Sequence, residues 1–349
     1  MWINERKTNL RFRLFAADAR YTIGLMKTAE FDYNLPKELI AQQPLADRAA
    51  SRMMVVERAT GTIRHEEFRN FARYLQTGDR LVLNDTKVIP ARIWSGRPNL
   101  ELLLVENLGD NRWSALVKPG ARAKVGVRLE FVPWLHAVIE GETDFGGRVL
   151  RFTGNVESYL ANHGAPPLPP YIDRAQSDSA DRDRYQTVFA QVPGAIAAPT
   201  AGLHFTPATL AELPHTFITL HVGIGTFRPV KVENVEEHKM HAERFSVSEI
   251  AASEMRTAKR IVAVGTTVAR TLETLGELRA GNGTTDIFIR PPYRFKVVSA
   301  LLTNFHLPKS TLLMLVSAFA GRELILKAYA EGIRERYRFF SYGDCMLIV

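Results

Sequence analysis

One loop in the middle of the chain combines polar side chains with an otherwise uncharged sequence. Residues 193–210 read PGAIAAPTAGLHFTPATL, with one imidazole, that of His204. Because Gly and Pro interrupt regular backbone, this sequence predicts a shaped loop that presents Thr200, His204 and Thr206 around Gly202. A neutral imidazole presented in this way can remove a proton from a substrate. The segment alone leaves open the alternative of a histidine satisfied within the core.

Two further segments place glycines and hydroxyls directly after buried strands. HVGIGTFRP spans 221–229, and VGTTVART spans 264–271. Glycine lets backbone N–H groups approach an anionic or sugar-bearing ligand, and a helix N-terminus favours a partly negative group. A plain tight turn in the first segment, and N-capping by Thr266 or Thr267 in the second, are the alternatives. The candidate ligand-binding residues here are His221, Gly225, Thr226, Arg228, Thr266, Thr267 and Arg270.

Two more segments hold candidate groups for proton transfer and binding. In KMHAERF, His241 and Glu243 are two residues apart, so in a strand they share one face and form a possible acid/base pair; two solvated polar residues are the alternative. In LLTNFHLPKS, Ser310 or the following Thr311 is expected to cap a helix, whereas the cation of Lys309 opposes the helix dipole and is expected to serve a ligand. No CxxC, HExxH or acidic cluster indicates a metal site. The candidate binding residues of this segment are Asn304, His306, Lys309 and Ser310.

The elements predicted around these segments indicate an α/β main domain with an inserted all-β barrel-like domain. Short strands without helices recur in RLVLND, VIPARIW, LELLLVEN, RWSALVK, VRLEFV, LHAVIEG and RVLRFTG, a pattern typical of a small barrel. After residue 156, helices alternate with strands such as RIVAVGTT, TDIFI and ALLTNF, which is the α/β pattern. Residues 32–42 are expected to form a short helix. The predicted domains are 26–80 with 156–349 for the α/β part and 81–155 for the barrel.

Composition limits the class of protein and its compartment. The chain has 349 residues, of which 46% are hydrophobic, and this excludes disordered and fibrous classes. A formal net charge of +8 favours a polyanionic partner such as nucleic acid. A single cysteine, Cys345, cannot form an internal disulfide, so a cytoplasmic location is expected. The sequence predicts no signal peptide and no membrane span.

Residues 1–25 differ from the sequence that follows them. They are basic and have no apolar core, so they are predicted to be an extension that is disordered or that results from a start codon assigned ahead of Met26. The alternative, a basic arm for RNA, is disfavoured because such arms carry denser runs of Lys and Arg.

Taken in order, the segments resemble those of one enzyme family. PGAIAAPTAGLHFT, HVGIGTFRPV, MHAERF, VGTTVARTLE, TDIFI, LLTNFHLPKSTLLMLVSAFAG and FFSYGD are similar to motifs of the S-adenosylmethionine:tRNA ribosyltransferase-isomerases of queuosine biosynthesis. The resemblance runs from about Met26 to the C-terminus and includes DYNLPKELIAQQPL and GDRLVLNDTKVIPAR. It implies an α/β domain interrupted by a β-barrel.

The resemblance also implies a reaction. In this family the ribosyl part of S-adenosylmethionine moves to 7-aminomethyl-7-deazaguanine at the wobble position of a tRNA with a GUN anticodon; epoxyqueuosine forms, and adenine and methionine leave. S-adenosylmethionine is thus a co-substrate, no true cofactor is implied, and a monomer is expected. Two other classes compete with this interpretation. They are an RNA-binding module without catalysis and a conventional methyltransferase, which leaves S-adenosylhomocysteine.

The implied chemistry gives the candidate residues provisional roles. His204 or His241 is the expected base, with Glu243 orienting it or relaying a proton. The expected substrate-binding residues are Thr200, Gly202, Thr206, His221, Gly225, Thr226, Arg228, Thr266, Thr267, Arg270, Asn304, His306, Lys309 and Ser310.

Overall fold

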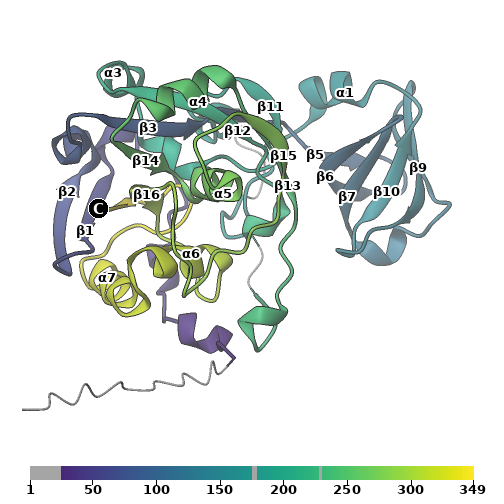
Figure 1. Cartoon of the computed structure of the whole chain (residues 1–349). Helices are drawn as coiled ribbons and strands as arrows, with labels where there is room; N and C mark the ends of the chain where they lie inside the picture. The colour runs from purple at the N-terminus through teal and green to yellow at the C-terminus, as the bar shows by residue number, and fades with distance from the viewer. Residues whose placement is uncertain (1–24, 175–178, 228–229) are drawn as a thin grey trace, which may run out of the picture.

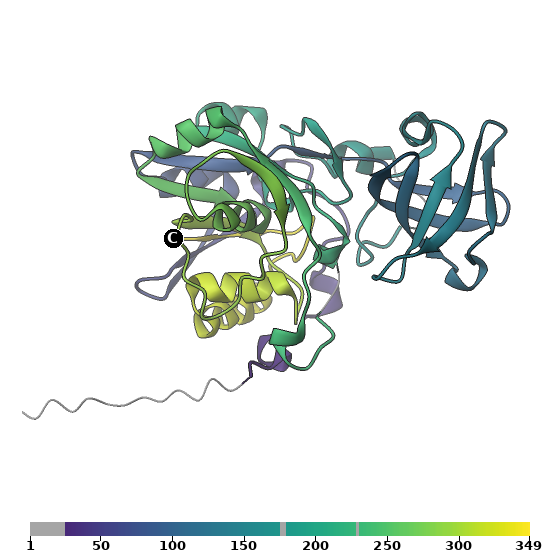
Figure 2. The same cartoon turned by 45° about the vertical axis from the view of Figure 1, so that its right-hand side comes forward.

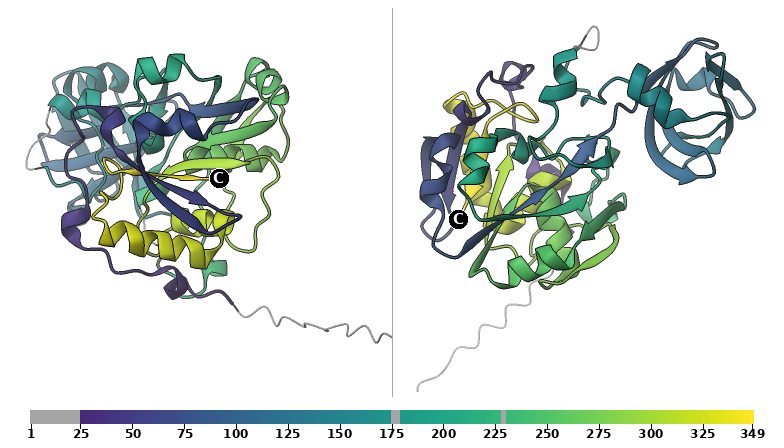
Figure 3. Two further views of the ribbon diagram at one scale, coloured as in Figure 1. Left: turned by 90° about the vertical axis from the view of Figure 1, so that its left-hand side faces the viewer. Right: turned by 90° about the horizontal axis from the view of Figure 1, so that it is seen from above.

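A computed structural model describes residues 25–174, 179–227 and 230–349. One large sheet packed between helices forms the main body, and a smaller all-β unit stands to one side of it (Figures 1 and 2). Viewed from above, the two parts are joined through the segment around β4 (Thr86–Val88) and β5 (Arg92–Ser95) and the chain that returns from α1 (Val156–His163) (Figure 3). The extension predicted for residues 1–25 lies outside the described residues, apart from Leu25.

The large sheet has nine strands in the order β15-β13-β12-β3-β14-β16-β17-β1-β2. β12, β3, β14 and β16 are mutually parallel neighbours, so their carboxyl ends meet at one edge of the sheet. β13 runs antiparallel to β12, and the edge strand β15 runs antiparallel to β13. The strands are β1 Arg52–Glu57, β2 Thr62–Glu67, β3 Asp79–Asn84, β12 His215–Leu220, β13 Glu243–Val247, β14 Arg260–Val264, β15 Gly281–Thr285, β16 Ala300–Asn304 and β17 Cys345–Ile348. A separate two-stranded parallel sheet pairs β4 Thr86–Val88 with β11 Val192–Ala195.

Both faces of the large sheet are covered, because alternate residues of its central strands belong to two different cores. Val82 and Ala263 pack with α4 to α7, whereas Leu81 and Val262 pack with Phe68 and other residues of the opposite layer. That opposite layer contains the 3-10 helices Phe68–Tyr74 and Thr200–His204. The helices are α1 Val156–His163, α2 Ser179–Arg184, α3 Pro207–Ala211, α4 Glu249–Arg256, α5 Thr266–Leu275, α6 Thr311–Ala320 and α7 Arg322–Arg334.

The smaller unit is a six-stranded antiparallel barrel, called here the β-domain. Its strand order is β5-β6-β7-β10-β9-β8, and the ends are joined because Gly96 N–H donates to Glu130 O (2.7 Å) and Glu130 N–H donates to Arg97 O (3.0 Å). A separate core that includes Leu102, Trp113 and Ile139 fills the barrel. The strands are β5 Arg92–Ser95, β6 Leu100–Gly109, β7 Arg112–Lys118, β8 Arg128–Val132, β9 Leu135–Glu142 and β10 Arg148–Phe152. The fold class predicted from the sequence, an α/β domain with an inserted barrel-like domain, is confirmed.

Several predictions for single elements are wrong. RLVLND, assigned to the barrel, forms β3 at the centre of the large sheet, because its nearly continuous burial suits a strand packed on both faces. VIPARIW is divided between β4 and β5. The domain boundaries themselves stay a prediction, and the position of β3 favours placing the first boundary closer to Arg92 than to residue 81.

Two other predicted elements are shorter than expected. The helix expected over residues 32–42 is a single 3-10 turn, Lys37–Leu39, because the backbone of Leu39 and Ala41 bonds to Phe339 instead. TDIFI is a strand only up to Thr285. Beyond that point the carbonyl of Ile287 accepts a hydrogen bond from Arg270 Nε, at 3.3 Å, in place of one from a neighbouring strand.

Candidate functional site

The polar segments gather where the four parallel strands end. β12, β3, β14 and β16 stop at Leu220, Asn84, Val264 and Asn304, and α5 and α6 begin close by. In open α/β sheets, ligands bind outside the carboxyl ends of the parallel strands. This edge of the sheet is therefore the expected place for a small-molecule site, and it carries two cavities.

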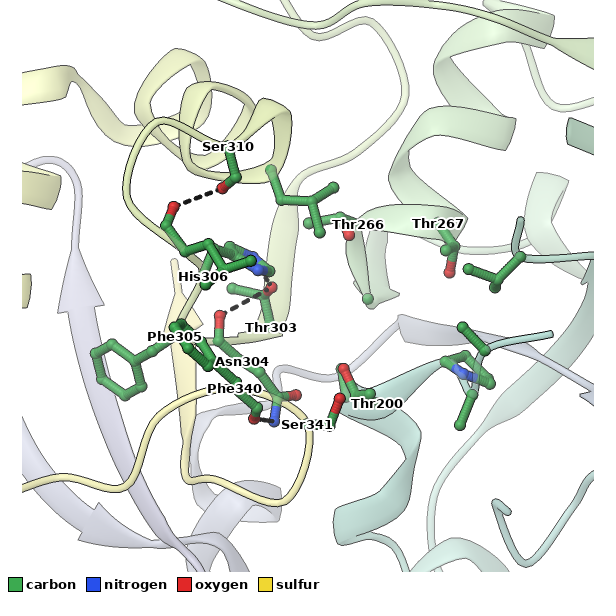
Figure 4. Close-up of a pocket in the computed structure, with 18 of the residues that line it drawn as sticks. Thr200, Thr266, Thr267, Thr303, Asn304, Phe305, His306, Ser310, Phe340 and Ser341 are labelled. Carbon is green, nitrogen blue, oxygen red and sulfur yellow. Dashed lines mark hydrogen bonds between the residues drawn. The ribbon is translucent and has the colours of Figure 1, made fainter. Parts of the chain in front are cut away.

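The first cavity is small and lined mainly by neutral groups; it is called here the hydroxyl cavity. Its volume is about 70 Å³, and it lies between the loop of Thr200, the start of α5 and the start of α6 (Figure 4). No Asp, Glu, Lys or Arg is among the described residues that line it. Its polar lining residues include Thr200, Thr266, Thr267, Thr303, Asn304, His306, Ser310 and Ser341.

Helix α5 begins at the hydroxyl cavity without a side-chain cap. Its N-cap is Gly265, whose φ of 96° suits glycine, and no side chain of the described residues caps the backbone of its first turn. The alternative in which Thr266 or Thr267 caps this helix is therefore wrong. Both threonines lie in the first turn and line the cavity instead. The positive end of the helix dipole thus adjoins the cavity.

Helix α6 is capped by Ser310, one of the two residues expected to do so. Its hydroxyl accepts from Leu313 N at 3.2 Å, an interaction that typically contributes about 1 kcal/mol. Ser310 therefore serves the helix and borders the cavity at the same time. Lys309, in contrast, reaches Asp32 at 2.7 Å and lines neither cavity, so its charge is balanced without a ligand.

Asn304 and His306 close the back of the hydroxyl cavity. Asn304 Nδ2 donates to Phe340 O (3.0 Å), which fixes the amide and leaves Oδ1 buried with no hydrogen-bond partner among the described residues. The imidazole of His306 bonds to Thr303 Oγ1 through Nε2 (2.8 Å). Burial lowers the pKa of His306 to about 3, so this imidazole is neutral at physiological pH.

The second cavity is wider, about 520 Å³, and is called here the histidine cavity. A buried ion pair between Glu243 and Arg270 lies in its wall, and the other carboxylate oxygen of Glu243 accepts from Gly223 N at 2.9 Å. His241 also lines it, although it precedes β13, which begins at Glu243. The described lining residues are Phe145, Gly225, Lys231, Val232, His238, Met240, His241, Glu243, Arg270, Thr311 and Leu312. Because Leu312 lines both cavities, they meet at the first turn of α6.

His204 lies outside both cavities. It borders a third one, of about 30 Å³, which shares Ser341 with the hydroxyl cavity, and its Nδ1 bonds to Ser51 Oγ at 2.8 Å. Burial lowers the pKa of His204 to about 4; nearby Asn304 opposes this shift, and the charges of Arg48 and Arg338 add to it. The imidazole is thus held neutral inside the protein, packed against Phe68.

Three further candidates have structural contacts that explain their residue types. Thr206 caps α3, with its hydroxyl accepting from Thr209 N (3.1 Å). At Gly202 an added Cβ would lie 2.8 Å from the ring of Phe189, so a larger residue would not fit. His221 bonds to Thr86 Oγ1 at 2.8 Å, and it lines none of the three cavities.

Two candidates in the glycine turn can be placed only in part. Gly225 and Thr226 lie in the 3-10 helix Ile224–Phe227, and Gly225 borders the histidine cavity, with an added Cβ 3.5 Å from His241. Arg228 lies outside the described residues.

Sequence reasoning missed several lining residues. Thr303 and Ser341 lie in LLTNFHLPKS and FFSYGD, two of the family-like segments. Thr303 precedes His306 by three residues, a spacing that allows their side chains to bond and could have indicated Thr303. His238 precedes His241 by three residues and also lines the histidine cavity. Phe145 gave no sequence signal, because its place in the cavity depends on how the β-domain sits against the sheet.

Within the described ranges, no group of three or more His, Cys, Asp or Glu side chains is arranged to hold a metal ion. Over the same residues, every helix is too short or too polar to cross a membrane.

The fold and the two adjoining cavities define an α/β enzyme with an inserted β-barrel. The sequence profile of the family described as "Queuosine biosynthesis protein" matches residues 28–348, so the chain belongs to that family. Relatives from Caldanaerobacter subterraneus subsp. tengcongensis and Moorella thermoacetica, both named S-adenosylmethionine:tRNA ribosyltransferase-isomerase, are each 52% identical to it, over 93% of this chain and 100% of theirs. The crystal structure of S-adenosylmethionine tRNA ribosyltransferase from Thermotoga maritima is similar, with a TM-score of 0.52 and 39% identity, over 92% of this chain and 100% of that one.

Proposed function

We propose that the chain transfers and isomerises the ribosyl part of S-adenosylmethionine onto 7-aminomethyl-7-deazaguanine at the wobble position of a GUN-anticodon tRNA. The products are epoxyqueuosine-tRNA, adenine and methionine. The names of the relatives support S-adenosylmethionine and tRNA as the substrates. S-adenosylmethionine is consumed as a co-substrate, with no further cofactor. The working form is a monomer in the cytoplasm, where tRNA is found.

One observation carries this proposal: a small neutral cavity and a wide one meet at the first turn of α6. A reaction between two large substrates needs two binding regions that touch at the reacting atoms. A site lined by hydroxyls and free of charged side chains also suits a sulfonium compound whose adjacent carbon loses a proton, because groups that would return the proton are excluded. The described lining of the hydroxyl cavity has this composition.

We assign proton removal to His241. Its side chain lines the histidine cavity, and no described residue hydrogen-bonds to its imidazole. Glu243 is engaged by Arg270 and Gly223 N, which suits a residue that orients groups and holds charge. His204, the other candidate base, lines neither of these two cavities, and its Nδ1 is engaged by Ser51.

The experiment that tests the function follows the products. The protein is incubated with S-adenosylmethionine and tRNA that carries the aminomethyl base, and adenine and methionine are measured by chromatography. Equal amounts of both products, with a matching mass increase of the tRNA, support the proposal. Methylated RNA with S-adenosylhomocysteine would identify a methyltransferase instead, and tRNA binding without any product would identify a binding module.

A further inference from the structure

One wall of the histidine cavity comes from the β-domain. Phe145 lies in the turn between β9 and β10, and it is the only β-domain residue among the described residues that line this cavity. All the others come from the α/β domain. The inserted barrel therefore contributes a half-buried aromatic ring to a site that the large sheet otherwise builds.

The turn holds the ring of Phe145 in a defined position. Its ring meets that of His241 edge to face, with centroids 6.1 Å apart and an interplanar angle of 88°. An added Cβ at Gly147 would lie 2.5 Å from Phe145 Cε2 and 2.6 Å from Ala115 O, so glycine is needed where the ring packs over the turn. Thr143 Oγ1 also accepts from Gly147 N at 2.8 Å. The ring is thus placed by the backbone of the turn as well as by His241.

The opposite wall offers hydrogen-bond acceptors. Among the described residues, each carboxylate oxygen of Glu243 has one hydrogen-bond partner, Gly223 N or Arg270, whereas a carboxylate has about four acceptor positions. A planar ligand against Phe145 can therefore donate N–H groups to this carboxylate. Enzymes that act on a base within a nucleic acid receive it in this way, by stacking on an aromatic ring and hydrogen bonding to its edge.

Cations without ion-pair partners lie at the same end of the β-domain. Lys118, Arg122 and Lys124 are exposed, and none of them forms an ion pair with another described residue. Their loop is tied to β10 because Arg148 Nε donates to Ala123 O at 2.5 Å. Phosphates of a nucleic acid are the partners that such cations favour.

We propose that Phe145 is the platform on which the modified base of the tRNA anticodon stacks, with Glu243 accepting from the edge of that base. This inference rests on the proposed function and names the subsite for one of its two substrates. The base is assigned here, rather than the adenine of S-adenosylmethionine, for three reasons. The cavity is the wider of the two, the exposed Lys231 lines it, and Lys118, Arg122 and Lys124, which form no ion pair with described residues, lie at the same end of the β-domain as Phe145.

The test separates stacking from hydrophobic filling by comparing Phe145→Ala, Phe145→Leu and Phe145→Tyr. Adenine release is measured with an anticodon stem-loop that carries the aminomethyl base, while each substrate is varied in turn. Loss of one base-stacking contact is expected to lower kcat/KM for the stem-loop about ten- to a hundredfold in the Ala and Leu variants. Phe145→Tyr should recover most of it, and the KM for S-adenosylmethionine should change less than about twofold. The matched control is Trp134→Ala, at the other end of β9 and about 25 Å away by strand rise.

Two results overturn the inference: a Leu variant as active as the wild type, or a rise in the KM for S-adenosylmethionine in place of the stem-loop effect. The affinity for the stem-loop, measured by fluorescence anisotropy without S-adenosylmethionine, tests the inference in a way that does not depend on turnover. If the wild type releases no adenine but Phe145→Ala weakens binding of the modified stem-loop more than of the unmodified one, the base subsite stands and the proposed function fails. If the wild type releases adenine normally and Phe145→Ala changes neither kcat/KM nor the affinity for the stem-loop, the base subsite is wrong while the proposed function stands.

Discussion

Glu243 and Arg270 form an ion pair in which each side chain is about 95% shielded from solvent. Arg270 also donates to the carbonyls of Thr285 and Ile287, both at 3.3 Å, so one guanidinium joins α5 to the segment that follows β15. A buried charge whose partner is removed is costly, whereas removal of both charges often is not.

Arg270→Ala is therefore expected to lower the free energy of unfolding by about 3 to 5 kcal/mol, because it leaves the carboxylate of Glu243 buried and unpaired. Urea denaturation followed by circular dichroism measures the change. The double variant Glu243→Gln, Arg270→Gln should lose less than the sum of the two single variants. Additive losses would show that the two side chains do not act as a pair.

His241→Ala is expected to lower kcat about a hundred- to ten-thousandfold, which is the usual loss when a general base is removed. Affinity for tRNA should change less than about tenfold, since contacts to phosphates supply most of it. Adenine release and anisotropy measure the two quantities. His204→Gln is the comparison: if it stays folded and its kcat falls as far while His241→Ala remains active, the assignment of the base must be reversed.

The outcome for Lys309 shows what the sequence could and could not provide. Local rules found the segment, the cap at Ser310 and the strand before it, because capping and apolar runs depend on neighbouring residues. They could not show that Asp32, distant in sequence, neutralises Lys309. Nor could they show that His204 and Thr200, four residues apart, border different cavities. Phe145 is the extreme case, because only the contact between two domains brings it to the site.

Lys309→Ala accordingly tests whether that residue serves a ligand. An exposed ion pair contributes up to about 1 kcal/mol, so only a small loss of stability is expected. The KM for S-adenosylmethionine should change less than about twofold, as measured by adenine release. A tenfold increase in that KM, with an unchanged melting temperature, would show that Lys309 binds a ligand after all.

Buried neutral histidines predict how stability depends on pH. The pKa of His204 is lowered to about 4 in the folded chain, below its ordinary value of 6.5, so the unfolded chain binds the extra proton. Stability from this group is thus complete above pH 6.5 and is lost as the pH falls toward 4. At pH 5 the loss is about 2 kcal/mol relative to pH 7.5. Urea titrations of the wild type and His204→Gln measure this difference. The exposed His163→Gln is the control, and an equal pH response in all three proteins would contradict the prediction.

Neutralising the exposed cations beside Phe145 should change the salt dependence of tRNA binding. Replacing Lys118, Arg122 and Lys124 by Gln removes three phosphate contacts if the anticodon lies there, and each contact contributes about 0.7 to 0.9 to the slope of log affinity against log salt. The slope should therefore become shallower by about 2 to 3 units, measured by anisotropy over a series of KCl concentrations. Lys37, Arg73 and Lys327 are likewise exposed and free of ion pairs with described residues, and they lie on the α/β domain outside the histidine cavity. Their triple Gln variant has the same net charge, so an equal effect on the slope would mean that overall charge, and not the end of the β-domain, attracts the tRNA.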